Sequence, residues 1–153
     1  KNNKWIYETI SSKNHVRGPF KAYRKDCFKA IGGLKNSIDW DTVDVLLAQY
    51  HGWKIKTDTT LKVKHLKPTG KYYNPKSRIL QGEAFYKMRY GFTITLIAAI
   101  KKGLTNLSFI SFVNDLKGFY KAKTNKTEYL VSEAEGKFIR KLRWKGIKSN
   151  ILS

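Results

Sequence analysis

The apolar positions of this chain recur at helical spacing over most of its length. In residues 37–52 the apolar side chains follow one another at intervals of three and four, which places them on one face of a predicted helix: Val43, Leu46, Leu47 and Tyr50. Gly52 stands where a left-handed cap would end that helix. A shorter helical run covers residues 24–31, and Gly32 and Gly33 are expected to stop it.

Alternation of apolar and polar residues predicts short strands on both sides of the central helix. Residues 16–23 suit a short strand that is entered through a turn. Residues 53–56 and 61–65 each alternate apolar with polar side chains, and a turn separates them. Strands and helices that alternate in this way favour an α/β fold for residues 1–76.

From residue 77 onward the pattern is helical throughout. A loop with two prolines and a glycine precedes this region. Three amphipathic segments follow, and their apolar stripes are Phe85, Met88 and Phe92, then Phe109, Phe112, Val113, Leu116 and Tyr120, then Val131, Ala134, Phe138 and Leu142. We therefore divide the chain into residues 1–76 and a basic, amphipathic helical region, residues 77–153.

Composition adds a strong positive charge to this pattern. The 153 residues include 31 lysines and arginines and 11 aspartates and glutamates, a formal net charge of +20, which attracts nucleic acid, phosphorylated substrates or anionic lipid. Residues 77–153 interleave basic with apolar side chains, as helices in an anionic membrane interface do. The same stripes could instead pack on one another, and both alternatives stay open. The most apolar window, residues 92–100, is too short to cross a bilayer.

The single cysteine excludes an internal disulfide and a cysteine-rich metal site. Cys27 falls in the short helical run and shares a face with Tyr23 and Ile31. We expect it to be a small core residue, and a catalytic nucleophile is the second alternative.

Three carboxylates crowd the start of the central helix: Asp39, Asp41 and Asp44. In a chain with so many basic residues, this cluster is a local concentration of negative charge. Aspartates at a helix N-terminus commonly accept hydrogen bonds from free amides and complement the helix dipole. The cluster alone therefore does not indicate an enzyme.

Three motifs occur in order between residues 16 and 65. The first runs from Arg17-Gly18 through Tyr23-Arg24-Lys25 to Ile31-Gly32-Gly33-Leu34. The second is Asp39-Trp40-Asp41, which opens a helix that ends in Gly52-Trp53-Lys54-Ile55. The third is Val63-Lys64-His65. Together they resemble the acceptor half of a family 2 glycosyltransferase, whose helix opens with an acidic pair and has its glycine eleven residues after the aspartate, as Asp41 and Gly52 do here. Trp40 stands where the family's motif has a glutamate.

The resemblance implies the GT-A form of an α/β fold, with the short strands and helices of the acceptor half followed by a helical C-terminal region. It also implies inverting transfer of a sugar from a nucleotide diphosphate donor to an acceptor hydroxyl. Asp41 would be the general base that takes the proton of the hydroxyl, a role that contributes ~10²–10⁴-fold. His65 would lie near the diphosphate or its metal ion, and Arg17, Lys64, Lys67 and Trp40 would contribute to substrate or diphosphate binding.

Cofactor and location follow from the same resemblance. A divalent metal, Mg²⁺ or Mn²⁺, is expected in the full-length enzyme, held mostly by a nucleotide-binding half that we expect before Lys1, with His65 as a further ligand. The Asp-x-Asp spacing of Asp39 and Asp41 also allows a second interpretation, in which these two aspartates hold a cation. This chain is not expected to act alone. We expect a carbohydrate or lipid-linked acceptor and a cytoplasmic location, with attachment to the inner face of an anionic membrane as an option.

Two other classes of function stay open. The charge and the many aromatic residues suit a nucleic-acid-binding module, but no helix-turn-helix, RNP-like or zinc-finger pattern occurs in the sequence, so nucleic acid is not the expected partner. The third class is a non-enzymatic domain whose helical region docks on a lipid surface or a protein partner.

Overall fold

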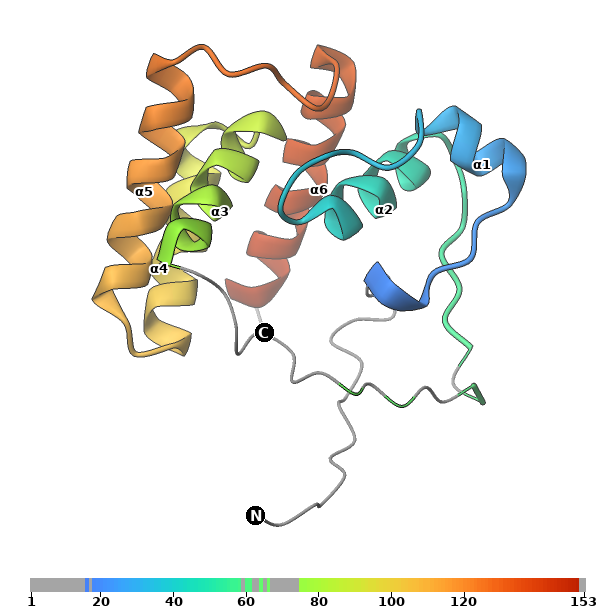
Figure 1. Cartoon of the computed structure of the whole chain (residues 1–153), viewed down its shortest axis with the longest axis horizontal. Coiled ribbons are helices and arrows are strands. Elements are labelled where there is room, and N and C mark those ends of the chain that lie inside the picture. The colour runs from blue at the N-terminus through green and yellow to red at the C-terminus, as the bar shows by residue number, and fades with distance from the viewer. Residues whose placement is uncertain are drawn as a thin grey trace.

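The computed structural model describes residues 16, 18–58, 60, 61, 64, 66 and 75–151. Within them the regular structure is helical (Figure 1). The elements are the 3-10 helix η1 (Gly18–Phe20) and the α-helices α1 (Lys25–Ala30), α2 (Trp40–Tyr50), α3 (Pro75–Lys87), α4 (Gly91–Thr105), α5 (Phe109–Thr124) and α6 (Glu133–Ile151). The predicted central helix, the short helix before it and the helical character of residues 77–151 are confirmed.

The predicted α/β fold is wrong for the described part of the chain, which contains no strand. Residues 16–23 form η1 and an irregular segment, and residues 53–56 are irregular. The third predicted strand, residues 61–65, lies partly outside the described residues. Alternation indicates which side chains could share a sheet face, but a strand also needs a neighbour for its amides and carbonyls. No described segment offers residues 53–56 such a neighbour.

Five helices end in the same way. One residue past each C-cap takes a positive φ, its amide donates to the carbonyl three residues back, and the next amide donates to the carbonyl five residues back. This is the Schellman arrangement, which uses the last helical carbonyls. The residues with positive φ are Gly32, Gly52, Arg89, Leu107 and Lys126, at the ends of α1 to α5. The predicted stops at Gly32 and Gly52 are thereby confirmed.

The backbones of α3 and α5 approach closely because glycines face each other across the contact. A Cβ built on Gly82 would lie 1.8 Å from the carbonyl oxygen of Asp115, and one built on Gly118 would lie 1.9 Å from the carbonyl oxygen of Ile79. Consequently the buried residues of α5 are not the predicted apolar stripe. They are Asp115, Gly118, Phe119 and Ala122.

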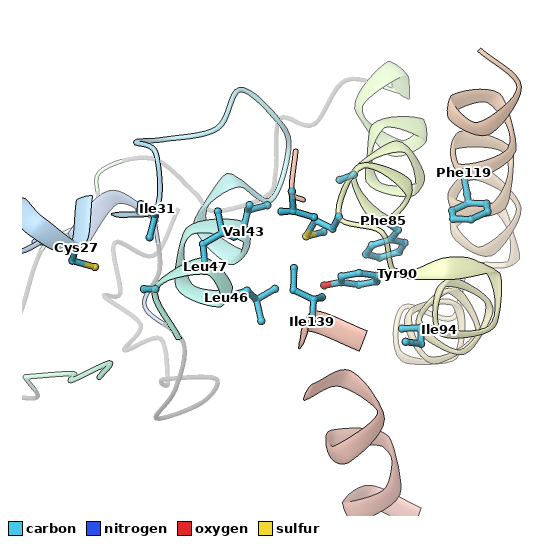
Figure 2. Packing of buried hydrophobic residues seen from close by; sticks show 14 residues of the cluster. Cys27, Ile31, Val43, Leu46, Leu47, Phe85, Tyr90, Ile94, Phe119 and Ile139 are labelled. Atoms are coloured by element: carbon cyan, nitrogen blue, oxygen red, sulfur yellow. The ribbon is translucent and has the colours of Figure 1, made fainter. Parts of the chain in front are cut away.

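The hydrophobic core joins α1 and α2 to the helices that follow residue 75. Figure 2 shows side chains of α2 turned toward those of α3, with Ile139 of α6 among them and Cys27 of α1 beyond α2. Val43, Leu46 and Leu47 are buried as predicted, and so is Cys27. Tyr50 remains 37% exposed and meets the ring of Phe138 edge-on. On α6, Ile139 is fully buried, while Ala134 of the predicted apolar stripe is exposed.

Membrane-spanning segments were not expected, and none of the helices among the described residues combines the length and the apolar character that crossing a bilayer requires.

The glycine contact between α3 and α5 predicts a large effect of one methyl group. Gly118→Ala should lower the free energy of unfolding by about 3 kcal/mol or more, because its Cβ would meet backbone atoms that cannot move independently. Chemical denaturation measures this change. The control is Gly146→Ala in α6, where nothing lies within 4 Å of the added Cβ. It should raise stability by about 0.5–1 kcal/mol, as helix propensity dictates. Equal effects of the two substitutions would contradict the close contact.

Candidate functional site

The start of α2 gathers the residues that the sequence singles out. Asp39 is the N-cap residue and has the left-handed φ of 62°, and its side chain accepts no hydrogen bond from the helix amides. The simple capping explanation of the acidic cluster therefore does not hold for Asp39. Each of the three aspartates instead has different partners, and the partners of Asp41 and Asp44 come from the part of the chain before α1.

Asp44 is completely buried and holds that segment in place. Its carboxylate receives a 2.7 Å ion pair from the Nζ of Lys21 and a hydrogen bond from the hydroxyl of Tyr23. The Lys21 side chain is only 5% exposed, so this pair has little access to water. Burial raises the pKa of the Tyr23 hydroxyl, and its hydrogen bond to Asp44 raises the pKa further. Tyr23 therefore stays protonated and acts as a donor.

Asp39 links α2 to α3. Its Oδ2 accepts a hydrogen bond from the side-chain amide of Gln81. Burial raises the pKa of Asp39, the Gln81 hydrogen bond opposes that rise, and the neighbouring Asp41 adds to it. The positive charges of Lys102 and Arg143 lower the same pKa.

Asp41 faces the first motif. Its Oδ2 accepts a 3.2 Å hydrogen bond from the backbone amide of Gly18, 23 residues earlier in the chain. The ring of Trp40 packs on the same glycine, since a Cβ added to Gly18 would lie 2.8 Å from that ring. The Nζ of Lys21 lies 5.5 Å from the centre of the Trp40 ring and also donates to the carbonyl of Asp41. Two separate sequence motifs thus meet at one carboxylate.

A second polar cluster lies between the helices beside the core. The Nζ of Lys102 bonds both carboxylate oxygens of the buried Asp115, at 3.0 and 3.1 Å. Arg143 donates twice to the hydroxyl of Tyr90, at 2.9 and 2.6 Å. Burial raises the pKa of Asp115 and of Tyr90, and in each case the basic partner opposes the rise. The four groups compensate one another, so this cluster has a structural role.

The structure brings only some of the predicted site residues together. Asp41 and Trp40 lie at the same place, on Gly18. Lys64 is exposed on an irregular segment. Arg17, His65 and Lys67 lie outside the described residues, and the roles predicted for them stay predictions.

Three residues of this region were missed by sequence reasoning: Lys21, Tyr23 and Gln81. Both side chains bond the carboxylate of Asp44, and the strand predicted for residues 16–23 would place residues 21 and 23 on one face, so this spacing is a signal that could have found them. Nothing in the sequence distinguishes Gln81 from other polar residues of α3.

The donor set of the described residues does not fit a metal ion. They contain no group of three or more histidine, cysteine or carboxylate side chains close enough to hold one. Asp39 and Asp41 are turned to Gln81 and Gly18 respectively.

The chain matches no protein-family model, no curated protein and no solved structure. The resemblance to family 2 glycosyltransferases thus depends on the three sequence motifs.

The buried ion pair predicts strong and non-additive effects on stability. Asp44→Ala should lower the free energy of unfolding by about 3–5 kcal/mol, because it leaves the Lys21 ammonium buried and unpaired. Lys21→Met should have a similar effect, and the double variant Lys21→Met/Asp44→Leu should recover much of the loss. A denaturation-based double-mutant cycle measures this coupling. Single effects below about 1 kcal/mol, as for exposed pairs, would contradict the burial of this pair.

The raised pKa of Asp39 predicts a pH-dependent gain from Asp39→Asn. The folded chain binds this proton more tightly than the unfolded chain, so its contribution to stability is present at low pH and is lost as pH rises from the ordinary value of 3.8 through the raised one. Asparagine has no such titration and can still accept the Gln81 bond. The variant should therefore gain more stability over wild type at about pH 7 than at about pH 3 in urea denaturation. A gain that is the same at both pH values would contradict the raised pKa.

Proposed function

We propose that this chain is the acceptor-side part of an inverting glycosyltransferase related to family 2, with Asp41 as the general base. One observation supports this most directly: the amide of Gly18 holds the carboxylate of Asp41, so the first two motifs of the resemblance meet in space. Such a meeting is not required by the sequence, since 23 residues separate the two positions.

The three aspartates differ in their suitability as a base. Asp44 is fully buried and paired with Lys21, so a substrate hydroxyl cannot reach it. Asp39 is engaged by Gln81, whose side-chain amide already donates a hydrogen bond to its Oδ2. Asp41 is partly exposed and sits in the first turn of α2, where a rigid helix and the Gly18 amide fix the direction of its carboxylate. Fixed direction is what a general base needs.

The proposed step moves one proton and one sugar. The hydroxyl oxygen of the acceptor forms a bond to the anomeric carbon of the donor, and the bond from that carbon to the diphosphate oxygen breaks. The hydroxyl proton passes to Asp41, and the bonding electrons leave with the nucleoside diphosphate. Attack opposite to the leaving group inverts the anomeric centre.

The donor side of the reaction belongs to residues that the resemblance places elsewhere. A nucleotide-binding part, with its Mg²⁺ or Mn²⁺, would precede the three motifs and supply electrostatic stabilisation of the leaving diphosphate. Arg17, Lys64 and His65 remain candidates for contacts to that diphosphate. The proposed setting is cytoplasmic, and the acceptor is a carbohydrate or a lipid-linked carbohydrate.

The test is Asp41→Asn in the intact enzyme. Turnover, followed as release of nucleoside diphosphate from a panel of nucleotide sugars with acceptor present, should fall by about 10²–10⁴-fold because the base is lost. Donor affinity, measured by calorimetry, should change little. Asp26→Asn is the matched control, since Asp26 is also an aspartate in the first turn of a helix but is exposed on α1. It should leave turnover unchanged.

Two results would overturn the proposal. Turnover that survives in Asp41→Asn would remove the general base from this position. Failure of the wild-type protein to release nucleoside diphosphate from any nucleotide sugar, together with salt-sensitive binding to nucleic acid, would favour the basic binding module instead.

A further inference from the structure

The connection between α4 and α5 exposes a group of large apolar side chains. We call this group the α4–α5 corner; its members are Ile100, Leu104, Leu107, Phe109 and Ile110, which are 45, 70, 94, 76 and 63% exposed. Single exposed apolar residues are ordinary on protein surfaces, but five of them this exposed within residues 100–110 indicate an interaction site. The connection lies at one end of the helical body, where the chain passes from yellow to orange (Figure 1).

Leu107 violates two preferences at once. It occupies the left-handed position of the Schellman arrangement with φ 47°, a conformation that strongly favours glycine. Its side chain is 94% exposed, so no burial compensates for the backbone strain. At the corresponding ends of α1, α2, α3 and α5 the chain has Gly32, Gly52, Arg89 and Lys126, none of them an apolar side chain. Strain kept without a packing benefit indicates a function of the exposed side chain.

The corner is a well-formed turn. Ser108 caps α5, its Oγ accepting a 3.3 Å hydrogen bond from the amide of Ser111. The rings of Phe109 and Phe112 are 5.7 Å apart. Gly103 brings the end of α4 close to α5, because a Cβ there would lie 3.2 Å from that of Phe112. The apolar side chains are therefore presented on a rigid support.

Lysines lie near the corner. Residues 91–113 contain Lys101 and no acidic residue, while the charge of Lys102 in the same segment is neutralised by Asp115. The carboxyl-terminal part of α6 runs toward the same end of the helical body (Figure 1). It carries Lys145 and Lys148, both exposed, and Trp144, 37% exposed. Tryptophan next to lysine is the composition typical of membrane interfaces.

We propose that the α4–α5 corner inserts into the interface of an anionic lipid membrane, while the lysines at this end of the molecule contact the headgroups. The apolar side chains of the turn would enter the boundary between headgroups and acyl chains, and the flanking lysines would meet the anionic headgroups. A second copy of the chain fits less well, because two molecules that each carry a formal charge of +20 repel one another. This proposal does not rest on the glycosyltransferase proposal, since it concerns other residues and no chemical step.

The experiment is sedimentation of the whole chain with vesicles of phosphatidylcholine alone and with about one-third phosphatidylserine. Because the protein is strongly basic, it will bind the anionic vesicles partly through charge alone. The informative variants are therefore those that leave the net charge of the protein unchanged. Leu107→Asn removes the apolar side chain and suits the left-handed backbone, so it should fold at least as stably as wild type. It should weaken vesicle binding by about tenfold. Phe109→Ser should act in the same direction.

Leu34→Asn is the matched control, because Leu34 is 52% exposed in the connection between α1 and α2, away from the corner. It should bind vesicles as wild type does. Lys145→Gln and Lys148→Gln should each weaken binding by about fivefold and reduce its salt dependence.

The proposal is overturned by absence of binding to the anionic vesicles, or by equal binding of Leu107→Asn, Leu34→Asn and wild type. Sedimentation velocity without lipid gives the third outcome. Self-association of wild type that Leu107→Asn abolishes would assign the corner to contacts between copies instead of to lipid.

Discussion

The ion pair between Lys21 and Asp44 is the contact on which the arrangement at the start of α2 depends. The segment from η1 to α1 has no regular structure from residue 21 to residue 24, so its backbone cannot position itself through helix or sheet hydrogen bonds. The buried 2.7 Å ion pair and the Tyr23 hydrogen bond hold it against α2 instead. Because a buried charge without its partner is costly, alternative positions of this segment are disfavoured. The position of the Gly18 amide on Asp41 follows from that restraint.

The helices could be predicted from the sequence because each has local signals that agree with its packing. Val43, Leu46 and Leu47 repeat at helical spacing and are buried, and Gly52 adopts the left-handed conformation expected of it. The strands could not be predicted reliably, because alternation over four residues contains no information about a partner. Likewise, nothing local indicates that Gln81 would meet Asp39, 42 residues away.

The buried face of α5 shows a second limit of hydrophobic patterns. Its predicted stripe contains Phe109 and Tyr120, which are 76 and 49% exposed, whereas the face that packs on α3 contains Asp115 and Gly118. Close approach of two backbones needs small residues, and the carboxylate of Asp115 is tolerated there because Lys102 neutralises it. A pattern based on size and polarity therefore assigns the wrong face wherever a helix contact is made by backbone.

Arg89 and Leu107 both have a positive φ although neither is glycine, and they differ in the contacts that support this conformation. The left-handed conformation of Arg89 is supported by its packing, since its guanidinium stacks 3.6 Å from the centre of the Tyr129 ring and its Nε donates to the carbonyl of Val131. Leu107 has no comparable support, since its apolar side chain is 94% exposed to water. Proteins retain such local conflicts chiefly where function requires them. This conflict falls at the α4–α5 corner, and the backbone geometry and exposure of Leu107 support the function that we propose there independently of the charge.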